Sequence, residues 1–222
     1  MKPLLRLSAL LPVVLTATLV AAGANRTFVI EEATIGQVHA AFRTGALTCE
    51  ALVASYLARI ERFDRQGPAL NAIASVNPQA RQEAARLDRE FQTRGLTGPL
   101  HCVPIILKDN ILTAGWETTA GVAALAGFVP DHDATAVTRL KAAGAILLAK
   151  ANMPDLALNT LTTENLLRGP TRNPYGLDRV PAGSSGGTTV AIAANFGLVG
   201  LGTDTGGSVR GPAAHASVVG LR

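Results

Sequence analysis

The segment from residue 183 to residue 213 reads GSSGGTTVAIAANFGLVGLGTDTGGSVRGPA. Nine of the 29 residues between Gly183 and Gly211 are glycine, and Ser and Thr are interleaved with them. A flexible linker of this composition would not contain the apolar helical stretch 190–194 in its middle. The segment therefore predicts an ordered, glycine-rich loop region built around a short helix.

Helical and strand-like patterns alternate through the residues that precede this segment. Apolar side chains recur at helical spacing in residues 48–63, and a second helix opens at Asn77-Pro78 and stops at Gly95. This alternation predicts an α/β domain with a largely parallel sheet that is covered on both faces. The expected strands are 72–76, 103–107 and 145–149, and a further helix is expected at 134–143.

The composition is that of a globular protein. The chain has 222 residues, of which 48% are hydrophobic and 16% charged, and these values exclude the disordered and fibrous classes. A length near 200 suggests one domain. The 20 basic and 16 acidic residues give a net charge of +4 and are scattered over polar helix faces. That distribution argues against a nucleic-acid partner.

The first 24 residues have the pattern of a secretory signal peptide. A positively charged start precedes an apolar run from residue 7 to residue 20, and small residues follow up to Ala24. We expect cleavage after Ala24, a secreted or periplasmic location, and a mature domain over residues 25–222 with no stable membrane anchor. The alternative is an uncleaved anchor, because the apolar run approaches the length of a spanning helix; Pro12 and the small residues favour cleavage.

The chain has two cysteines, Cys49 and Cys102. An exported protein reaches an oxidising compartment, so the two can form one disulfide. The alternative is a pair of buried thiols that pack as small apolar residues, and the distance between them in the fold decides. Together with four scattered histidines they show no metal-ligand spacing, so we expect no metal site.

A phosphate-binding loop is the first hypothesis for the glycine-rich segment. Glycines before a helix expose backbone N–H groups to anions. No Lys follows the glycines, however, as it would in a Walker loop. The spacing of Gly200, Gly202 and Gly206 is also wrong for a dinucleotide fingerprint. Nucleotide binding is therefore disfavoured.

A nucleophile elbow is the second hypothesis. Ser185 fits the pattern G-x-S-x-G, and Asp204 and His215 follow in the order of an α/β-hydrolase-type esterase. An elbow sits between a strand and a helix, whereas residues 177–182 are not an apolar strand. Ser185 and His215 are also only 30 residues apart, which leaves little chain for the strands that bring acid and base to the site.

A lysine supplies the third candidate. Lys108 ends the apolar run 103–107, which we expect to be buried, and the chain has only four Lys against 16 Arg. Burial penalises the charged form of a lysine and lowers its pKa, so a desolvated amine can act as a base near neutral pH. The alternative is a Lys at a strand end that pairs with Asp109 and reaches solvent.

Several blocks of the sequence resemble the amidase signature family. The segment 183–213 is similar to that family's Gly/Ser-rich signature over its whole length, and Leu107-Lys-Asp-Asn110 is similar to its second block. The resemblance implies the amidase signature fold, which is α/β with a mixed, mostly parallel sheet covered by helices on both faces. It extends from about Thr34 to Arg222, with further similarity at 98–104, 149–153 and 171–175.

The resemblance also implies a catalytic triad of Ser, cis-Ser and Lys. Ser208 matches the nucleophile, Ser184 the bridging serine that follows a cis peptide bond, and Lys108 the base. In physical terms, Ser208 needs a base to become nucleophilic, and Ser184 can relay its proton to a neutral Lys108. Ser184 can later return a proton to the departing amine. This chemistry needs neither a metal nor a cofactor, and we expect none.

Further site residues are expected around this triad. Backbone N–H groups just before the nucleophile would form an oxyanion hole, where glycine lets a substrate carbonyl approach closely. Asp204 and Arg210 would support the loop, with a surface ion pair as the alternative. Ser185 would help to hold Ser184 or Lys108. The expected oxyanion-hole residues are Thr205, Gly206, Gly207 and Ser208.

The expected function is an amidohydrolase that cleaves a carboxylic amide of a small-molecule substrate through an acyl-enzyme on Ser208. Members of the family continue with a second segment of comparable size, so we expect the domain to be incomplete at its C-terminus. The alternative is therefore an inactive truncated fragment of an amidase. The signal peptide disfavours work in a transamidating complex. The sequence assigns neither a particular amide nor an oligomeric state.

Overall fold

The computed structural model describes residues 28–222. The predicted signal peptide, residues 1–24, lies outside the described residues. Within the described part of the chain, no helix is long and apolar enough to cross a membrane. The elements in chain order are α1 (Ile35–Arg43), α2 (Cys49–Ile60), η1 (Glu61–Arg65), β1 (Ile73–Val76), α3 (Ala80–Arg94), β2 (Pro104–Lys108), η2 (Ala123–Leu125), α4 (Thr135–Ala142), β3 (Ile146–Ala151), η3 (Asp155–Ala157), α5 (Gly186–Ala193), β4 (Val199–Leu201) and α6 (Arg210–His215).

The four strands form one sheet in the order β1-β3-β2-β4. β2 is parallel to both of its neighbours, β3 and β4, whereas β1 is antiparallel to β3. The expected mixed, mostly parallel sheet is therefore confirmed. In sheets of this kind, functional residues gather just beyond the carboxyl ends of the parallel strands. Lys108 is the last residue of β2 and lies in register with Ala151 of β3, at that edge.

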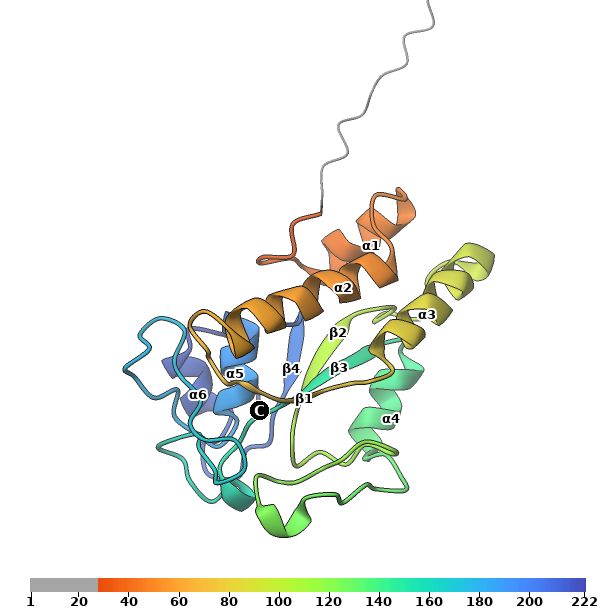
Figure 1. Ribbon diagram of the computed structural model, residues 1–222. Coiled ribbons are helices and arrows are strands. Elements are labelled where there is room, and N and C mark those ends of the chain that lie inside the picture. The colour runs from red at the N-terminus through yellow and green to blue at the C-terminus, as the bar shows by residue number, and fades with distance from the viewer. Residues whose placement is uncertain (1–27) are drawn as a thin grey trace, which may run out of the picture.

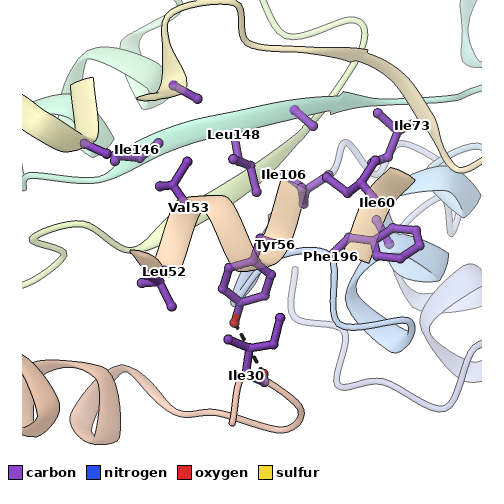
Figure 2. Packing of buried hydrophobic residues seen from close by; sticks show 14 of the residues in the cluster. Ile30, Leu52, Val53, Tyr56, Ile60, Ile73, Ile106, Ile146, Leu148 and Phe196 are labelled. Carbon is purple, nitrogen blue, oxygen red and sulfur yellow. Dashed lines mark hydrogen bonds between the residues drawn. The ribbon is translucent and has the colours of Figure 1, made fainter. Parts of the chain in front are cut away.

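The larger part of the hydrophobic core lies on one face of the sheet. Helices α2, α3 and α5 pack there, as Figures 1 and 2 show. Val53 and Tyr56 of α2 belong to the same buried cluster as Ile106 of β2 and Leu148 of β3. Each fully buried side chain of this size stabilises the fold by about 1.5–3 kcal/mol. This packing holds the sheet rigidly beneath α2.

The opposite face of the sheet carries a second, smaller cluster. Alternation along β2 directs Ile105 and Leu107 to this side, where Leu147 of β3 joins them. Val137 of α4 and Trp116 of the loop that follows β2 cover these residues. Figure 1 places α4 across the sheet from α2 and α3. Helices therefore cover both faces, as expected.

The predicted elements correspond to α2, β1, α3, β2, α4, β3 and α5, with ends that differ by a few residues. Among the α-helices and strands of residues 28–222, three have no counterpart among the predictions: α1, β4 and α6. β4 has three residues and α6 has six, so neither is long enough to show a periodic pattern. The start of α1 does carry a signal, because Thr34 and Gln37 form a capping box.

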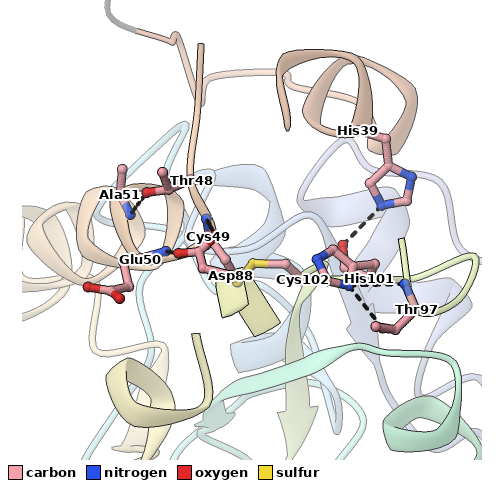
Figure 3. Close-up of a disulfide and its surroundings, with 9 residues drawn as sticks. All are labelled: His39, Thr48, Cys49, Glu50, Ala51, Asp88, Thr97, His101 and Cys102. Atoms are coloured by element: carbon pink, nitrogen blue, oxygen red, sulfur yellow. Dashed lines mark hydrogen bonds between the residues drawn. A yellow bond between two sulfur atoms is a disulfide. The ribbon is translucent and has the colours of Figure 1, made fainter. Parts of the chain in front are cut away.

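A disulfide joins Cys49 and Cys102, whose Cα atoms are 5.8 Å apart (Figure 3). Cys49 is the first residue of α2, and Cys102 lies just before β2, so the bridge ties a helix start to the strand that ends at Lys108. The carboxylate of Asp88 in α3 accepts hydrogen bonds from the Cys49 and Glu50 N–H groups at 2.7 and 2.9 Å. A carboxylate satisfies the free amides at a helix N-terminus and complements its positive end. Three elements are thus joined where the chain enters β2.

Candidate active site

Lys108 is fully buried at the end of β2. Its Nζ lies 2.6 Å from the Oγ of Ser184, 2.8 Å from the Oγ1 of Thr203 and 3.5 Å from the Thr203 carbonyl oxygen. The neighbouring Asp109 accepts hydrogen bonds from Thr119 instead of pairing with Lys108. The alternative of a solvent-reaching lysine paired with Asp109 is therefore wrong, because the Lys108 side chain has no exposed surface.

The surroundings of Lys108 favour its neutral form. Burial lowers the pKa of Lys108 from its ordinary value near 10.5 to about 8, because an ammonium group is poorly solvated in the protein interior. The negative charge of Asp204 acts in the opposite direction. A neutral amine carries a lone pair that can accept a proton from the hydroxyl it faces. The contact with Ser184 is therefore suited to proton transfer.

Ser184 follows a cis peptide bond from Gly183 and is fully buried. The chain is crowded at this point: a Cβ added to Gly183 would collide with the carbonyl oxygens of Asn159 and Thr162. Glycine is therefore required where these backbones approach each other. The loop that contains residues 159–162 thus packs directly on the turn that presents Ser184 to Lys108.

Ser208 lies in the loop between β4 and α6, and its side chain is also buried. Its carbonyl oxygen accepts a hydrogen bond from the Ser185 N–H at 3.0 Å. This backbone contact joins the loop of Ser208 to the residue that follows Ser184. The structure therefore places Lys108 and Ser184 in direct contact and brings the backbone of Ser208 next to the residue that follows Ser184, although these residues are far apart in the sequence.

Asp204 organises the loop that carries Ser208. Its carboxylate accepts hydrogen bonds from the N–H groups of Gly207 at 2.7 Å and Val209 at 3.2 Å, and from Nε and Nη2 of Arg210 at 3.0 and 3.2 Å. The Asp204 side chain is 3% exposed, so this is more than a surface ion pair. The Arg210 guanidinium and the backbone donors hold the pKa of Asp204 well below its usual range.

The structure differs from the predicted oxyanion hole at one position, Gly207. The Gly207 N–H points to Asp204, so it is not available for a substrate oxygen. The N–H groups of Thr205, Gly206 and Ser208 have no acceptor within residues 28–222. Gly207 itself has φ of +108°, a conformation that favours glycine. Three of the four predicted donors are therefore free.

The other chemistries suggested by the sequence lack the geometry that they need. The Ser185 hydroxyl donates to the Thr203 carbonyl oxygen at 3.2 Å, and Nδ1 of His215 lies 3.0 Å from the Gly211 carbonyl oxygen. With the Asp204 carboxylate bound within its own loop, no acid and base meet Ser185, and the nucleophile elbow is not formed. Residues 28–222 contain no group of three or more His, Cys, Asp or Glu side chains that could hold a metal ion.

Two polar side chains of the site, Thr203 and Asn110, were not predicted from the sequence. Thr203 Oγ1 accepts hydrogen bonds from both Lys108 Nζ and Asn110 Nδ2. Sequence pattern alone cannot pair Asn110 with Thr203, because 93 positions separate them. The usable signal was proximity in the chain, because Asn110 lies only two residues after Lys108, in the turn that follows β2.

A comparison with known families agrees with this geometry. The family model described as Amidase matches residues 51–222, a range that includes Lys108, Ser184 and Ser208. The chain belongs to the amidase family. The expected resemblance to amidase signature proteins is therefore confirmed, and the α/β architecture described above is shared with solved amidases.

Individual amidase-family relatives match most of this chain. The glutamyl-tRNA(Gln) amidotransferase subunit of Deinococcus radiodurans is 44% identical over 189 residues, which are 85% of this chain and 38% of the relative. The native peptide amidase from Stenotrophomonas maltophilia is 44% identical, with a TM-score of 0.79 over 82% of this chain and 38% of that chain. An amidase family protein from Bacillus anthracis str. Ames is 35% identical, with a TM-score of 0.79 over 84% of this chain and 39% of that chain. This chain thus spans less than half of the length of the relatives that it matches.

Proposed function

We propose that this chain carries the catalytic residues of an amidase that hydrolyses a linear carboxylic amide through an acyl-enzyme on Ser208. The observation that carries the proposal is the 2.6 Å contact between Lys108 Nζ and Ser184 Oγ in a fully buried setting. A lysine with a lowered pKa beside a hydroxyl can act as a base through that hydroxyl. The backbone bond from Ser185 to Ser208 supports a position of the nucleophile beside this pair.

In the acylation step, neutral Lys108 accepts the proton of Ser184 while Ser184 accepts the proton of Ser208. The Ser208 oxygen forms a bond to the amide carbon, and one C=O electron pair moves to oxygen. The free N–H groups of Thr205, Gly206 and Ser208 stabilise this developing negative charge. When the carbonyl re-forms, the C–N bond breaks, Ser184 donates a proton to the leaving nitrogen, and Lys108 returns one to Ser184. Ammonia or an amine leaves, and the acyl group stays on Ser208.

Water completes the reaction through the same proton path. Its proton passes by way of Ser184 to Lys108 while its oxygen attacks the ester carbon on Ser208. The ester C–O bond then breaks, and the proton returns to the Ser208 oxygen. Amide and water give carboxylic acid and amine, and the enzyme ends in its starting protonation state. These steps use only the chain's own hydroxyl, amine and backbone N–H groups.

We further propose a small-molecule amide, R-CO-NH2 or R-CO-NHR, as the substrate, and a secreted or periplasmic location. The name peptide amidase of one relative supports amide hydrolysis, while the name amidotransferase of another supports the transfer alternative. The predicted signal peptide favours hydrolysis outside the cytoplasm over work in a transamidating complex. The disulfide between Cys49 and Cys102 fits an oxidising compartment.

A serine-directed phosphonate tests the assignment of the nucleophile. The chain is treated with a fluorophosphonate, and the labelled peptide is located by mass spectrometry. We expect the label on Ser208 and its complete loss in Ser208→Ala. Ser55→Ala removes an exposed serine of α2 and should be labelled at the wild-type rate. Circular dichroism first establishes that each variant has the wild-type fold.

Each other outcome of this labelling experiment points away from the proposal. Label on Ser185 would favour the esterase alternative, and label that survives Ser208→Ala would overturn the role of Ser208. A folded wild-type chain that takes no label would support the alternative of an inactive fragment. Release of ammonia or amine from a panel of simple amides by the same preparation would then show that the labelled chain also turns over substrate.

A further inference from the structure

Thr203 provides two of the hydrogen-bond acceptors around Lys108. Its Oγ1 lies 2.8 Å and its carbonyl oxygen 3.5 Å from Lys108 Nζ, and the Oγ of Ser184 is the third neighbour at 2.6 Å. A neutral lysine amine has two N–H bonds and one lone pair. When it donates both N–H groups to Thr203, its lone pair faces Ser184. The orientation of Thr203 therefore decides whether Lys108 can accept the Ser184 proton.

Two residues hold Thr203 in place. The hydroxyl of Ser185 bonds both the carbonyl oxygen and the N–H of Thr203, at 3.2 and 3.3 Å, and so fixes its backbone. A fixed backbone still leaves the threonine side chain a choice of staggered rotamers. Asn110 makes the contact that selects one of them, because its Nδ2 donates to Thr203 Oγ1 at 3.1 Å. Oγ1 is thereby held toward Lys108.

Asn110 makes this contact although its other polar atom is left without a partner. Its Oδ1 is buried and has no hydrogen-bond partner within residues 28–222. An unpaired buried oxygen destabilises a fold, so an amide at this position is not explained by stability. The neighbouring Asp109 is bound to Thr119, which fixes the turn of the chain between Lys108 and Asn110. The hydrogen bond from its Nδ2 to Thr203 is therefore the contribution that explains an amide side chain at position 110.

We propose that Asn110 is a positioning residue for the base: its amide holds the Thr203 hydroxyl as an acceptor for Lys108 and so aims the Lys108 nitrogen at Ser184. This proposal rests on the proposed role of Lys108 as the base. It adds a requirement that the residue at position 110 be uncharged.

The charges already present around Lys108 explain this requirement. The carboxylate of Asp204 acts on Lys108, and Arg210 compensates it through two hydrogen bonds. A carboxylate at position 110 would be separated from the Lys108 amine only by the Thr203 side chain. Unlike Asp204, it would have no arginine to compensate its charge. It would stabilise the ammonium form of Lys108, which has no lone pair. An isosteric Asn110→Asp change should therefore weaken the base without removing any group of the triad.

Titration of Lys108 by NMR tests the proposal without any need for turnover. The chain has four Lys, so lysine labelled with 13C at Cε gives few signals, and Lys108→Met assigns the one from Lys108. The wild-type midpoint is expected at about 8. Asn110→Asp should raise this pKa by at least about 1. Asn110→Leu keeps the size and neutrality but removes Nδ2, and should lower it because the ammonium loses an oriented acceptor.

Two controls separate this effect from a general disturbance. Asn195→Asp makes the same chemical change at the far end of α5, where Asn195 bonds Glu32, and should leave the Lys108 midpoint unchanged. The signal of Lys141, an exposed lysine of α4 that pairs with Asp133, is an internal reference in every spectrum. Equal Lys108 midpoints in the wild type and both Asn110 variants would overturn the proposal.

The two Asn110 variants test different parts of the proposal: Asn110→Asp tests the effect of charge, and Asn110→Leu tests the loss of the hydrogen bond to Thr203. If the Lys108 midpoint shifts in Asn110→Asp but not in Asn110→Leu, the positioning role is overturned. Such a result would show that a charge at position 110 acts on Lys108 only through its proximity. If Asn110→Asp does not fold, the direction of the shift in Asn110→Leu decides alone. None of these results depends on reactivity at Ser208, so failure here is distinct from failure of the labelling experiment.

Discussion

Lys108 and Lys150 are buried lysines on neighbouring parallel strands, and they differ in their partners. Both side chains are fully buried, and burial lowers the pKa of each to about 8. Lys108 Nζ lies 2.6 Å from the hydroxyl of Ser184. Lys150 Nζ instead donates to the carbonyl oxygen of Ile111 at 3.1 Å and to the hydroxyl of Thr118.

Burial and a lowered pKa therefore do not by themselves make a lysine a base. Lys150 is surrounded by groups that favour its charged form: the Trp116 ring, whose centroid is 5.5 Å from Nζ, and the carboxylates of Asp109 and Glu117. Its hydrogen bonds hold together the loop that follows β2. Lys108 faces a hydroxyl beside the loop of Ser208. The difference in partners therefore supports the proposed role of Lys108 as a base and a structural role for Lys150.

The rate of Ser208 labelling should distinguish the two lysines most strongly. Lys108→Met should slow phosphonate labelling of Ser208 by about 10²–10⁴-fold, which is the usual contribution of a general base. Lys150→Met should change the rate far less, because Lys150 does not contact the triad. The measurement is the labelling time course of each folded variant. An equal loss of rate in both variants would remove the distinction between them.

A smaller effect separates the lysines by stability, in the opposite order. Lys150→Met removes one of the two hydrogen bonds that the Ile111 carbonyl oxygen accepts and leaves only the one from the Thr113 hydroxyl. It also removes a cation near the buried Asp109, so it should lower the free energy of unfolding by about 2 kcal/mol. Lys108→Met should cost less, because two of its partners are hydroxyls that can rotate and the third, the Thr203 carbonyl oxygen, keeps its hydrogen bond from Ser185. Urea unfolding at a common m value measures both. A larger loss in Lys108→Met would contradict the structural role of Lys150.

The fold could be predicted wherever a pattern was long enough. The helix expected over 48–63 and the buried strand over 103–107 are periodic or continuous in apolar residues, and both are present as α2 and β2. The short strand β4 is decided by pairing with β2, and no pattern of three residues reveals that. The direction of β1 was equally hidden, because β1 skips β2 along the sheet and pairs with β3.

The site could be predicted only as far as the resemblance reached. The blocks 107–110 and 183–213 identified the residues of the predicted triad, and the structure places Lys108 against Ser184 and the backbone of Ser208 against that of Ser185. The engagement of the Gly207 N–H by Asp204 depends on the path of one loop, which a motif does not specify. The bond from Asn110 to Thr203 depends on side chains from distant segments. Without that resemblance, the sequence offered no reason to separate Lys150 from Lys108, because both lie in or next to apolar runs.

The decisive measurement is the pH dependence of Ser208 labelling in the wild type, Lys150→Met and Lys108→Met. Below a pH of about 8 the Lys108 ammonium has no lone pair, so the wild-type rate should rise with pH through about 8 and level off above it. Lys150→Met should keep this rise, and Lys108→Met should lose it. A rise that persists in Lys108→Met but disappears in Lys150→Met would show that the other buried lysine governs Ser208, and would contradict the assignment of the base.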